Sequence, residues 1–200
     1  KGIVNPDRTI SEPYKAALKP FHAFEKAVLI RIQEISDGAD RLISLYFKDG
    51  NKPLLLRSLD HPFYEISDED HLDVVFDQVL RVMDRENAFA LDFTLKESDV
   101  WVIKKSTNSS KIDASAIASL QNMEEEQLKA VTALLSQPLA SVTIIPFSSR
   151  AESKQQGCVL MKSESSNWML ETFRGNNGSV RIRSLPKEEI LKHLQRILTP

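Results

Sequence analysis

The chain has 200 residues, of which 42% are hydrophobic and 27% are charged, a balance typical of a folded protein and not of a disordered one. Its 26 basic and 28 acidic residues give a formal net charge of −2, so the composition lacks the basic excess by which nucleic-acid-binding domains are recognised. A chain of this length can bury one sizeable core or two small ones.

The first half of the chain alternates strand and helix patterns. Residues 1–23 contain three prolines and little periodicity, and we interpret them as a lead-in segment. Runs rich in β-branched and other apolar residues then predict strands, and Asp49-Gly50 predicts a tight hairpin turn. Ser67 and the acidic residues after it indicate a helix start, followed by an apolar stripe from Leu72 to Met83. The strands expected in this half cover 27–32, 41–48, 54–59, 88–95 and 100–104.

The second half shows the same alternation of strand and helix patterns. A polar loop at 106–111 leads to one or two helices between Ala114 and Ser136, which Pro138 ends. Pro186 then occupies the first position of a final amphipathic helix. Between these helices we expect strands over 142–147, 157–162, 168–174 and 180–185.

These elements predict an α+β fold built from two related halves, each a mainly antiparallel sheet with flanking helices. We expect the two halves to pack as one globular unit. The segments are a lead-in (1–23), a first α+β half (24–105), a helical connection (106–140) and a second α+β half (141–200).

An internal repeat supports the two halves. Residues 47–59 (FKDGNKPLLLRSL) align without a gap with residues 173–185 (FRGNNGSVRIRSL). Both segments predict strand, tight turn and strand, and both lead into an amphipathic helix. Because one hairpin and one helix cannot bury their apolar faces alone, we expect two copies to pack around a pseudo-twofold axis. Chance similarity between short hairpins is the alternative. The identical pairs are Phe47/Phe173, Asn51/Asn177, Arg57/Arg183, Ser58/Ser184 and Leu59/Leu185.

The polar clusters do not assemble a catalytic or metal site. Asp60-His61 and the run Asp68–Asp73 contain metal-ligating residue types, but acidic residues are expected at a helix start, and the two histidines lack a ligand spacing such as HxxxH. Cys158, the single cysteine, lies in an apolar strand, and we interpret it as a core residue. One cysteine permits no intramolecular disulfide and is consistent with a reducing compartment.

Four other features have an ordinary structural interpretation. The glycines and asparagines at 175–178 fit a hairpin turn better than a phosphate loop, and Arg181 and Arg183 fit a solvated strand face or a surface for an acidic partner. Trp101 and Trp168 fit core strand positions better than interface anchors. We therefore expect no catalytic residue, cofactor or metal ion, and we expect a protein without enzymatic activity.

The second half of the sequence resembles the EspG family of type VII (ESX) secretion chaperones. The residues that carry the resemblance are Ile112–Ala114, Leu134–Pro138, the strand 142–147, Gly157–Leu160, Trp168 and the closing unit 180–198. The resemblance implies two related halves with quasi-twofold symmetry. It also implies a cytosolic chaperone that binds a helical secretion substrate and covers the aggregation-prone tip of that substrate.

Together these observations favour a cytoplasmic, non-enzymatic protein-binding module, an adaptor or chaperone for a secreted helical partner. We expect no nucleic-acid partner and no membrane insertion, because no apolar run approaches the length of a membrane span. One alternative is a small-molecule-binding regulatory domain with a pocket between the two halves. Another is a hydrolase or transferase that uses Cys158 or the acidic and histidine residues of 60–73.

Overall fold

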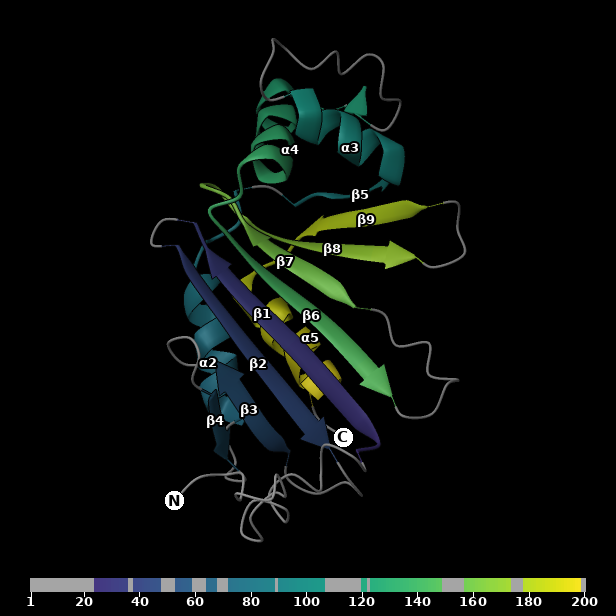
Figure 1. The fold of residues 1–200 in the computed structure, drawn as a ribbon. Coiled ribbons are helices and arrows are strands. Elements are labelled where there is room, and N and C mark those ends of the chain that lie inside the picture. Colours follow the sequence, from purple (N-terminus) through teal and green to yellow (C-terminus); the bar gives the residue numbers. More distant parts are fainter. Residues whose placement is uncertain are drawn as a thin grey trace, which may run out of the picture.

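The computed structural model describes residues 24–35, 38–47, 53–58, 64–67, 72–88, 90–106, 120–121, 123–148, 157–173 and 178–198. In this part of the chain, nine strands form one antiparallel sheet in the order β4-β3-β2-β1-β6-β7-β8-β9-β5 (Figure 1). The strands are β1 (Lys26–Glu34), β2 (Ala39–Phe47), β3 (Leu54–Ser58), β4 (Tyr64–Ser67), β5 (Asp92–Lys96), β6 (Ala140–Ser148), β7 (Cys158–Lys162), β8 (Asn167–Phe173) and β9 (Ser179–Ser184).

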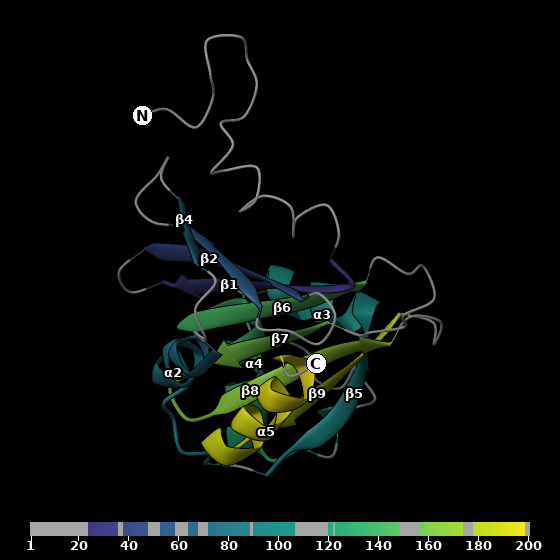
Figure 2. The same cartoon turned by 90° about the horizontal axis from the view of Figure 1, so that it is seen from below.

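The described helices form two layers on the sheet. The helices α2 (Leu72–Val82) and α5 (Lys187–Leu198) lie side by side behind the strands in Figure 1 and below β1, β2 and β6 in Figure 2. The helices α3 (Glu97–Ser106) and α4 (Glu125–Ser136) pack on the opposite face, over the half that holds β7, β8, β9 and β5. The strands β7 and β8 are therefore covered on both faces.

The alternation of side chains along the strands explains the two layers. In β8, Met169 belongs to the core under α2 and α5, whereas Trp168 and Leu170 belong to the core under α3 and α4. In β7, Leu160 belongs to the core under α2 and α5, and Met161 belongs to the core under α3 and α4. Because successive residues of a strand point to opposite faces, a strand covered on both faces has apolar residues at consecutive positions.

A long central strand pair joins the halves. All nine residues of β1 pair antiparallel with all nine of β6, with Ile30 opposite Ile144 at the centre. Both isoleucines are fully buried, and they lie in the core that α2 and α5 cover. The two halves therefore share one continuous sheet, where the sequence predicted a sheet for each half.

The α+β class and the antiparallel pairing are confirmed, and eight of the nine predicted strands overlap observed ones, although β5 begins at Asp92 and not at the predicted residue 88. One predicted strand is wrong, since Val100–Lys104 lies in α3. Val100 and Ile103 are buried while Trp101 and Val102 are exposed, which is the three-residue spacing of a helix and not the alternation of a strand. The acidic Glu97 and Asp99 in the first turn suit the positive end of the helix dipole. The expected core position of Trp101 is wrong for the same reason, whereas Trp168 is fully buried as expected.

The sequence did not predict β4, which holds Ser67, the residue expected to cap α2. The segment boundaries 1–23, 24–105, 106–140 and 141–200 remain predictions. The lead-in and the polar loop at 106–111 lie outside the described residues, except for Ser106 at the end of α3.

We predict that Ile30→Ala lowers the free energy of unfolding by about 2 to 5 kcal/mol, because it leaves a cavity at the centre of the shared core. Ile35→Ala is the matched control, since Ile35 follows the same strand and is 62% exposed. Chemical denaturation followed by circular dichroism measures both. Equal losses in the two variants would contradict the central role of the β1–β6 pair.

Candidate functional site

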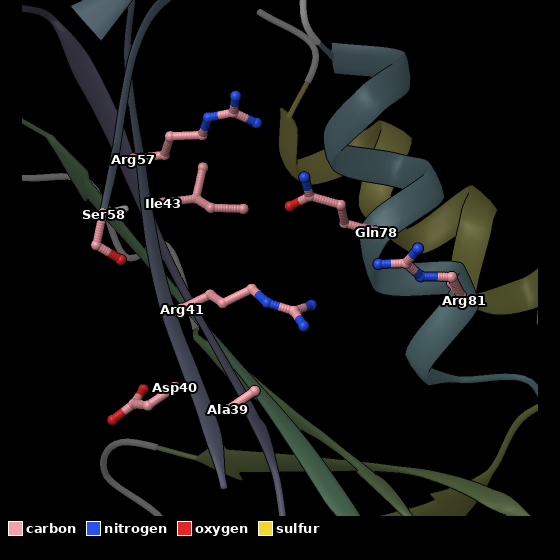
Figure 3. A pocket seen from close by; sticks show the side chains of 8 residues that line it. All are labelled: Ala39, Asp40, Arg41, Ile43, Arg57, Ser58, Gln78 and Arg81. Carbon is pink, nitrogen blue, oxygen red and sulfur yellow. The ribbon is translucent and has the colours of Figure 1, made fainter. Parts of the chain in front are cut away.

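A pocket of about 650 Å³ lies between the sheet and α2 within the first half of the chain. Arg41 and Ile43 of β2 and Arg57 of β3 point from the sheet toward α2, and Gln78 and Arg81 point back from the helix (Figure 3). The register accounts for the sheet wall, because Ile43 is directly opposite Arg57 and two residues from Arg41, which places all three on one face. Ala39, Asp40 and Ser58 complete the lining.

Two of the three arginines in this pocket have carboxylate partners on neighbouring strands. Arg41 Nη1 lies 3.2 Å from Glu34 Oε1, and Arg57 donates through Nε to Glu65. Arg81 forms no ion pair within the described part of the chain. The pocket lining therefore carries a net positive charge.

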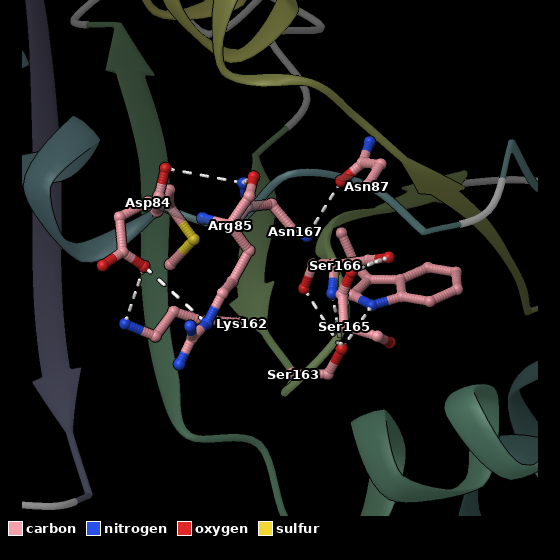
Figure 4. A network of polar contacts seen from close by, with 10 residues as sticks. Asp84, Arg85, Asn87, Lys162, Ser163, Ser165, Ser166 and Asn167 are labelled. Carbon is pink, nitrogen blue, oxygen red and sulfur yellow. Dashed lines mark hydrogen bonds and ion pairs between the residues drawn. The ribbon is translucent and has the colours of Figure 1, made fainter.

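A second polar group, buried in the turn between β7 and β8, connects the halves (Figure 4). Asn167 is fully buried, and its Nδ2 donates to the Arg85 carbonyl at 2.6 Å, while its Oδ1 accepts from the Arg85 amide at 3.4 Å. Ser163 Oγ accepts from Trp168 Nε1 at 3.0 Å. Since Arg85 follows α2, these bonds attach the end of the first half to the β7–β8 turn. We assign this network a structural role.

Cys158 has a histidine neighbour that the sequence did not indicate. Its Sγ lies 3.4 Å from Nε2 of His193 on α5, and Arg196 Nη2 lies 2.7 Å from His193 Nδ1. An arginine donates but does not accept, so Nδ1 is the acceptor and the remaining proton of a neutral ring is on Nε2, facing the sulfur. The two residues are 35 positions apart, so only the tertiary fold brings them together.

The environment of this pair keeps both groups neutral. Burial, together with the nearby Glu171 carboxylate, raises the pKa of the Cys158 thiol to about 12. Burial and the Arg196 guanidinium lower the pKa of His193. A cysteine nucleophile needs the opposite arrangement, a thiolate stabilised by an imidazolium. The geometry therefore favours the interpretation of Cys158 as a core residue, which is also 5% exposed.

The sheet face opposite α2 carries a band of apolar side chains across the first half. Residues directly opposite each other in an antiparallel pair point to the same face. The register therefore places Ile145, Leu29, Ser44, Leu56 and Ile66 in one row across five strands, and Phe147, Ala27, Tyr46 and Leu54 in the next row. We call these two rows the apolar sheet face.

Parts of the apolar sheet face are open to solvent. Phe147 is 47% exposed, Ile66 42% and Ile145 38%, although large apolar side chains in strands are usually buried. Within the described residues, no helix packs on this face in the first half, whereas α3 and α4 cover the same face of the second half. A covered region thus adjoins an open apolar one.

The residues singled out in the sequence are dispersed. The acidic and histidine cluster of 60–73 lies largely outside the described residues, and the described residues contain no group of three metal-ligating side chains. The 175–178 turn is described only at Gly178, whose φ of 62° suits a glycine. Arg181 forms a two-bond ion pair with Asp92, and Arg183 pairs with Glu171, so both arginines contact acidic residues of this chain.

Sequence reasoning missed the arginine pocket and the apolar sheet face. Both combine residues from three or more elements, and the register that aligns them is not visible in a sequence. The described helices include none that is long and apolar enough to cross a membrane.

We predict that Asn167→Ala lowers the free energy of unfolding by about 1 to 3 kcal/mol, because it removes a fully buried side chain that bonds the partly buried amide and carbonyl of Arg85. Ser98→Ala, at an exposed site on α3, is expected to change stability by less than about 0.5 kcal/mol. Urea denaturation measures both variants. A loss of similar size in each would rule out this role for the network.

We predict that Cys158 in the folded protein reacts with a disulfide reagent at pH 8 about a thousandfold more slowly than in the unfolded chain. A thiol with a pKa near 12 holds far less thiolate at that pH than one with the ordinary value of 9.0. Because this is the single cysteine, the absorbance of the released thiol reports it directly. Comparable rates with and without guanidinium would show that burial does not suppress the thiolate, and a faster rate in the folded protein would show an activated thiol.

Comparison with known proteins gives a match in structure and none in sequence. No protein-family model matches the chain, and no curated protein matches it. Among solved structures, the chain is similar to the type VII secretion system chaperone EspG5 of Mycobacterium tuberculosis, solved in complex with a PE25–PPE41 dimer. The TM-score is 0.68 at 14% sequence identity, and the match covers 98% of this chain and 80% of EspG5. The resemblance to the EspG family is therefore confirmed at the level of fold, and it extends over both halves of the chain.

Proposed function

We propose that this protein is a chaperone or adaptor that binds a secreted partner protein and holds an apolar segment of that partner against the apolar sheet face. The observation that carries the proposal is the apolar sheet face, whose residues Ile145, Phe147 and Ile66 are exposed and whose Leu29, Tyr46 and Leu56 are half-buried. An exposed contiguous apolar surface on a folded protein marks an interaction site more often than it marks chance. The fold shared with EspG5, itself solved with a bound protein dimer, supports the same class of function.

The shape of this surface suits a helical partner segment. Phe147 and Ile145 on β6 lie at the border between the open half of the sheet and the half covered by α3 and α4. Half-buried Leu29 and Leu56 connect these residues to the exposed Ile66 on the edge strand β4. A partner helix with apolar residues at three- and four-residue spacing can place one face on such a band. The partner's polar face then stays in solvent.

A duplication of the two halves is part of the proposal, and the strand order supports it. A twofold axis between Ile30 and Ile144, perpendicular to the sheet, would map β1–β4 and α2 onto β6–β9 and α5. Such an axis reverses strand direction, in agreement with the antiparallel β1–β6 pair. The sequence repeat is shifted by one strand from this mapping. It aligns β2 and β3 with β8 and β9, whereas the axis maps β2 and β3 onto β7 and β8. The connectivity, more than the thirteen aligned residues, supports the duplication.

The alternative function, a regulatory domain that binds a small molecule, has partial support. The arginine pocket is a concave polar site of suitable size, but it lies between β2, β3 and α2 and not between the two halves. We place the protein in the cytoplasm, where a chaperone meets its substrate before secretion.

We predict that Phe147→Ser weakens partner binding at least about tenfold, since Phe147 is the most exposed large side chain of the apolar sheet face and truncation of an aromatic hot-spot residue costs about 2 kcal/mol or more. Val74→Ser is the matched control, because Val74 is 43% exposed on α2, behind the sheet. The measurement is a tagged pull-down from the native cell with mass spectrometry, followed by calorimetry with the purified partner.

The expected result is one stoichiometric partner that the wild type and Val74→Ser retain and that Phe147→Ser loses. Retention by all three proteins would place the interface elsewhere. A homogeneous protein that captures no partner would remove the support for a chaperone.

A further inference from the structure

We propose that the pocket lined by Arg41, Arg57 and Arg81 binds a small molecule that carries phosphate or carboxylate groups. This site lies on the sheet face that packs against α2, opposite the apolar sheet face. The residues that support this inference are therefore separate from those that support the proposed protein-binding function.

The first argument is the convergence of like charges. The guanidinium groups of Arg41 and Arg81 extend toward each other from β2 and α2, and Arg57 lies above them on β3 (Figure 3). Like charges that share a cavity repel each other, and an anion between them removes that cost. The carboxylate of Asp40 does not act as this anion. It points away from α2 and accepts two hydrogen bonds from Arg31, at 2.9 and 2.6 Å.

The second argument is the surplus of hydrogen-bond donors. An arginine has five N–H donors and no acceptor. Within the described residues, Arg41 uses Nη1 toward Glu34 and Arg57 uses Nε toward Glu65. Each of these ion pairs uses one guanidinium nitrogen, and both side chains extend from the sheet toward α2 (Figure 3). Arg81 and the Gln78 amide add donors from the facing helix.

The third argument concerns the class of ligand. Guanidinium groups bind carboxylate and phosphate through paired hydrogen bonds, which a lysine cannot imitate. The volume of about 650 Å³ exceeds that of a single phosphate ion and falls within the range of small-molecule sites. The surface of the cavity is mostly polar, with Ile43 as an apolar contact. These features fit a compact polyanion such as a phosphorylated metabolite or a polycarboxylate.

The experiment titrates the full chain with inorganic phosphate, with pyrophosphate and with citrate, using calorimetry and the shifts of arginine side-chain resonances. The proteins are the wild type, Arg81→Gln, Arg81→Lys and the control Arg181→Gln. Arg181 is also a strand arginine paired with a carboxylate, and its side chain is 40% exposed, but it lies on β9 in the second half. The phosphate and citrate arms distinguish the two oxyanion classes.

We expect one class of anion to bind at a single site, with Kd about tenfold or more higher in Arg81→Gln, an intermediate value in Arg81→Lys and no change in Arg181→Gln. Equal weakening in Arg81→Gln and Arg181→Gln would show non-specific attraction to surface charge and overturn the proposal. Wild-type Kd above about 10 mM for all three anions would overturn it as well.

Discussion

The antiparallel pairing of β1 with β6 is the constraint on which the rest of the structure depends. Every other described strand connects to the sheet through one of these two. Their nine-residue register fixes which residues of both strands face α2 and α5 and which face away. A slip of one residue would move Ile30 and Ile144 out of the core and expose both halves. Their full burial specifies the register more strongly than any hydrogen bond at the sheet edges.

From this pair outward, the two halves differ in what covers them. In the second half, β8 has apolar residues at consecutive positions (Trp168, Met169 and Leu170), because helices lie on both of its faces. The first half has one helix layer among the described elements, and its other face keeps exposed apolar side chains. As a result, the solvent-exposed apolar side chains of the sheet lie on the apolar sheet face of the first half. This is the physical basis for assigning a binding function to a protein whose cysteine–histidine pair is held neutral.

Much of the fold could be predicted from the sequence, because strands and amphipathic helices leave local patterns. The errors occurred where a local pattern was ambiguous. Val100–Lys104 is a short apolar run that fits a strand as well as a helix, and the buried Val100 and Ile103 decide for the helix. The strand β4 has only four residues and no strong alternation. Trp168 was placed correctly because a tryptophan within a clear strand run has few alternatives to the core.

The sites could not be predicted, since each depends on distances between elements far apart in the chain. Arg41, Arg57 and Arg81 have no common motif, and the pairing of β2 with β3 and the position of α2 bring them together. Cys158 and His193 meet only because α5 packs on β7.

The strands β2 and β3 belong to both proposed sites at once. Along β2, Arg41 and Ile43 face the pocket, while Tyr46 faces the other side; along β3, Arg57 faces the pocket, while Leu54 and Leu56 face away. Because a strand alternates its side chains, each site can be altered without touching a residue of the other. The backbone between them is common, however, so an anion that orders β2 and β3 from behind would also stiffen the apolar sheet face. A rigid apolar surface loses less conformational entropy when a partner binds, and a ligand in the arginine pocket would therefore strengthen binding of the partner without contacting it.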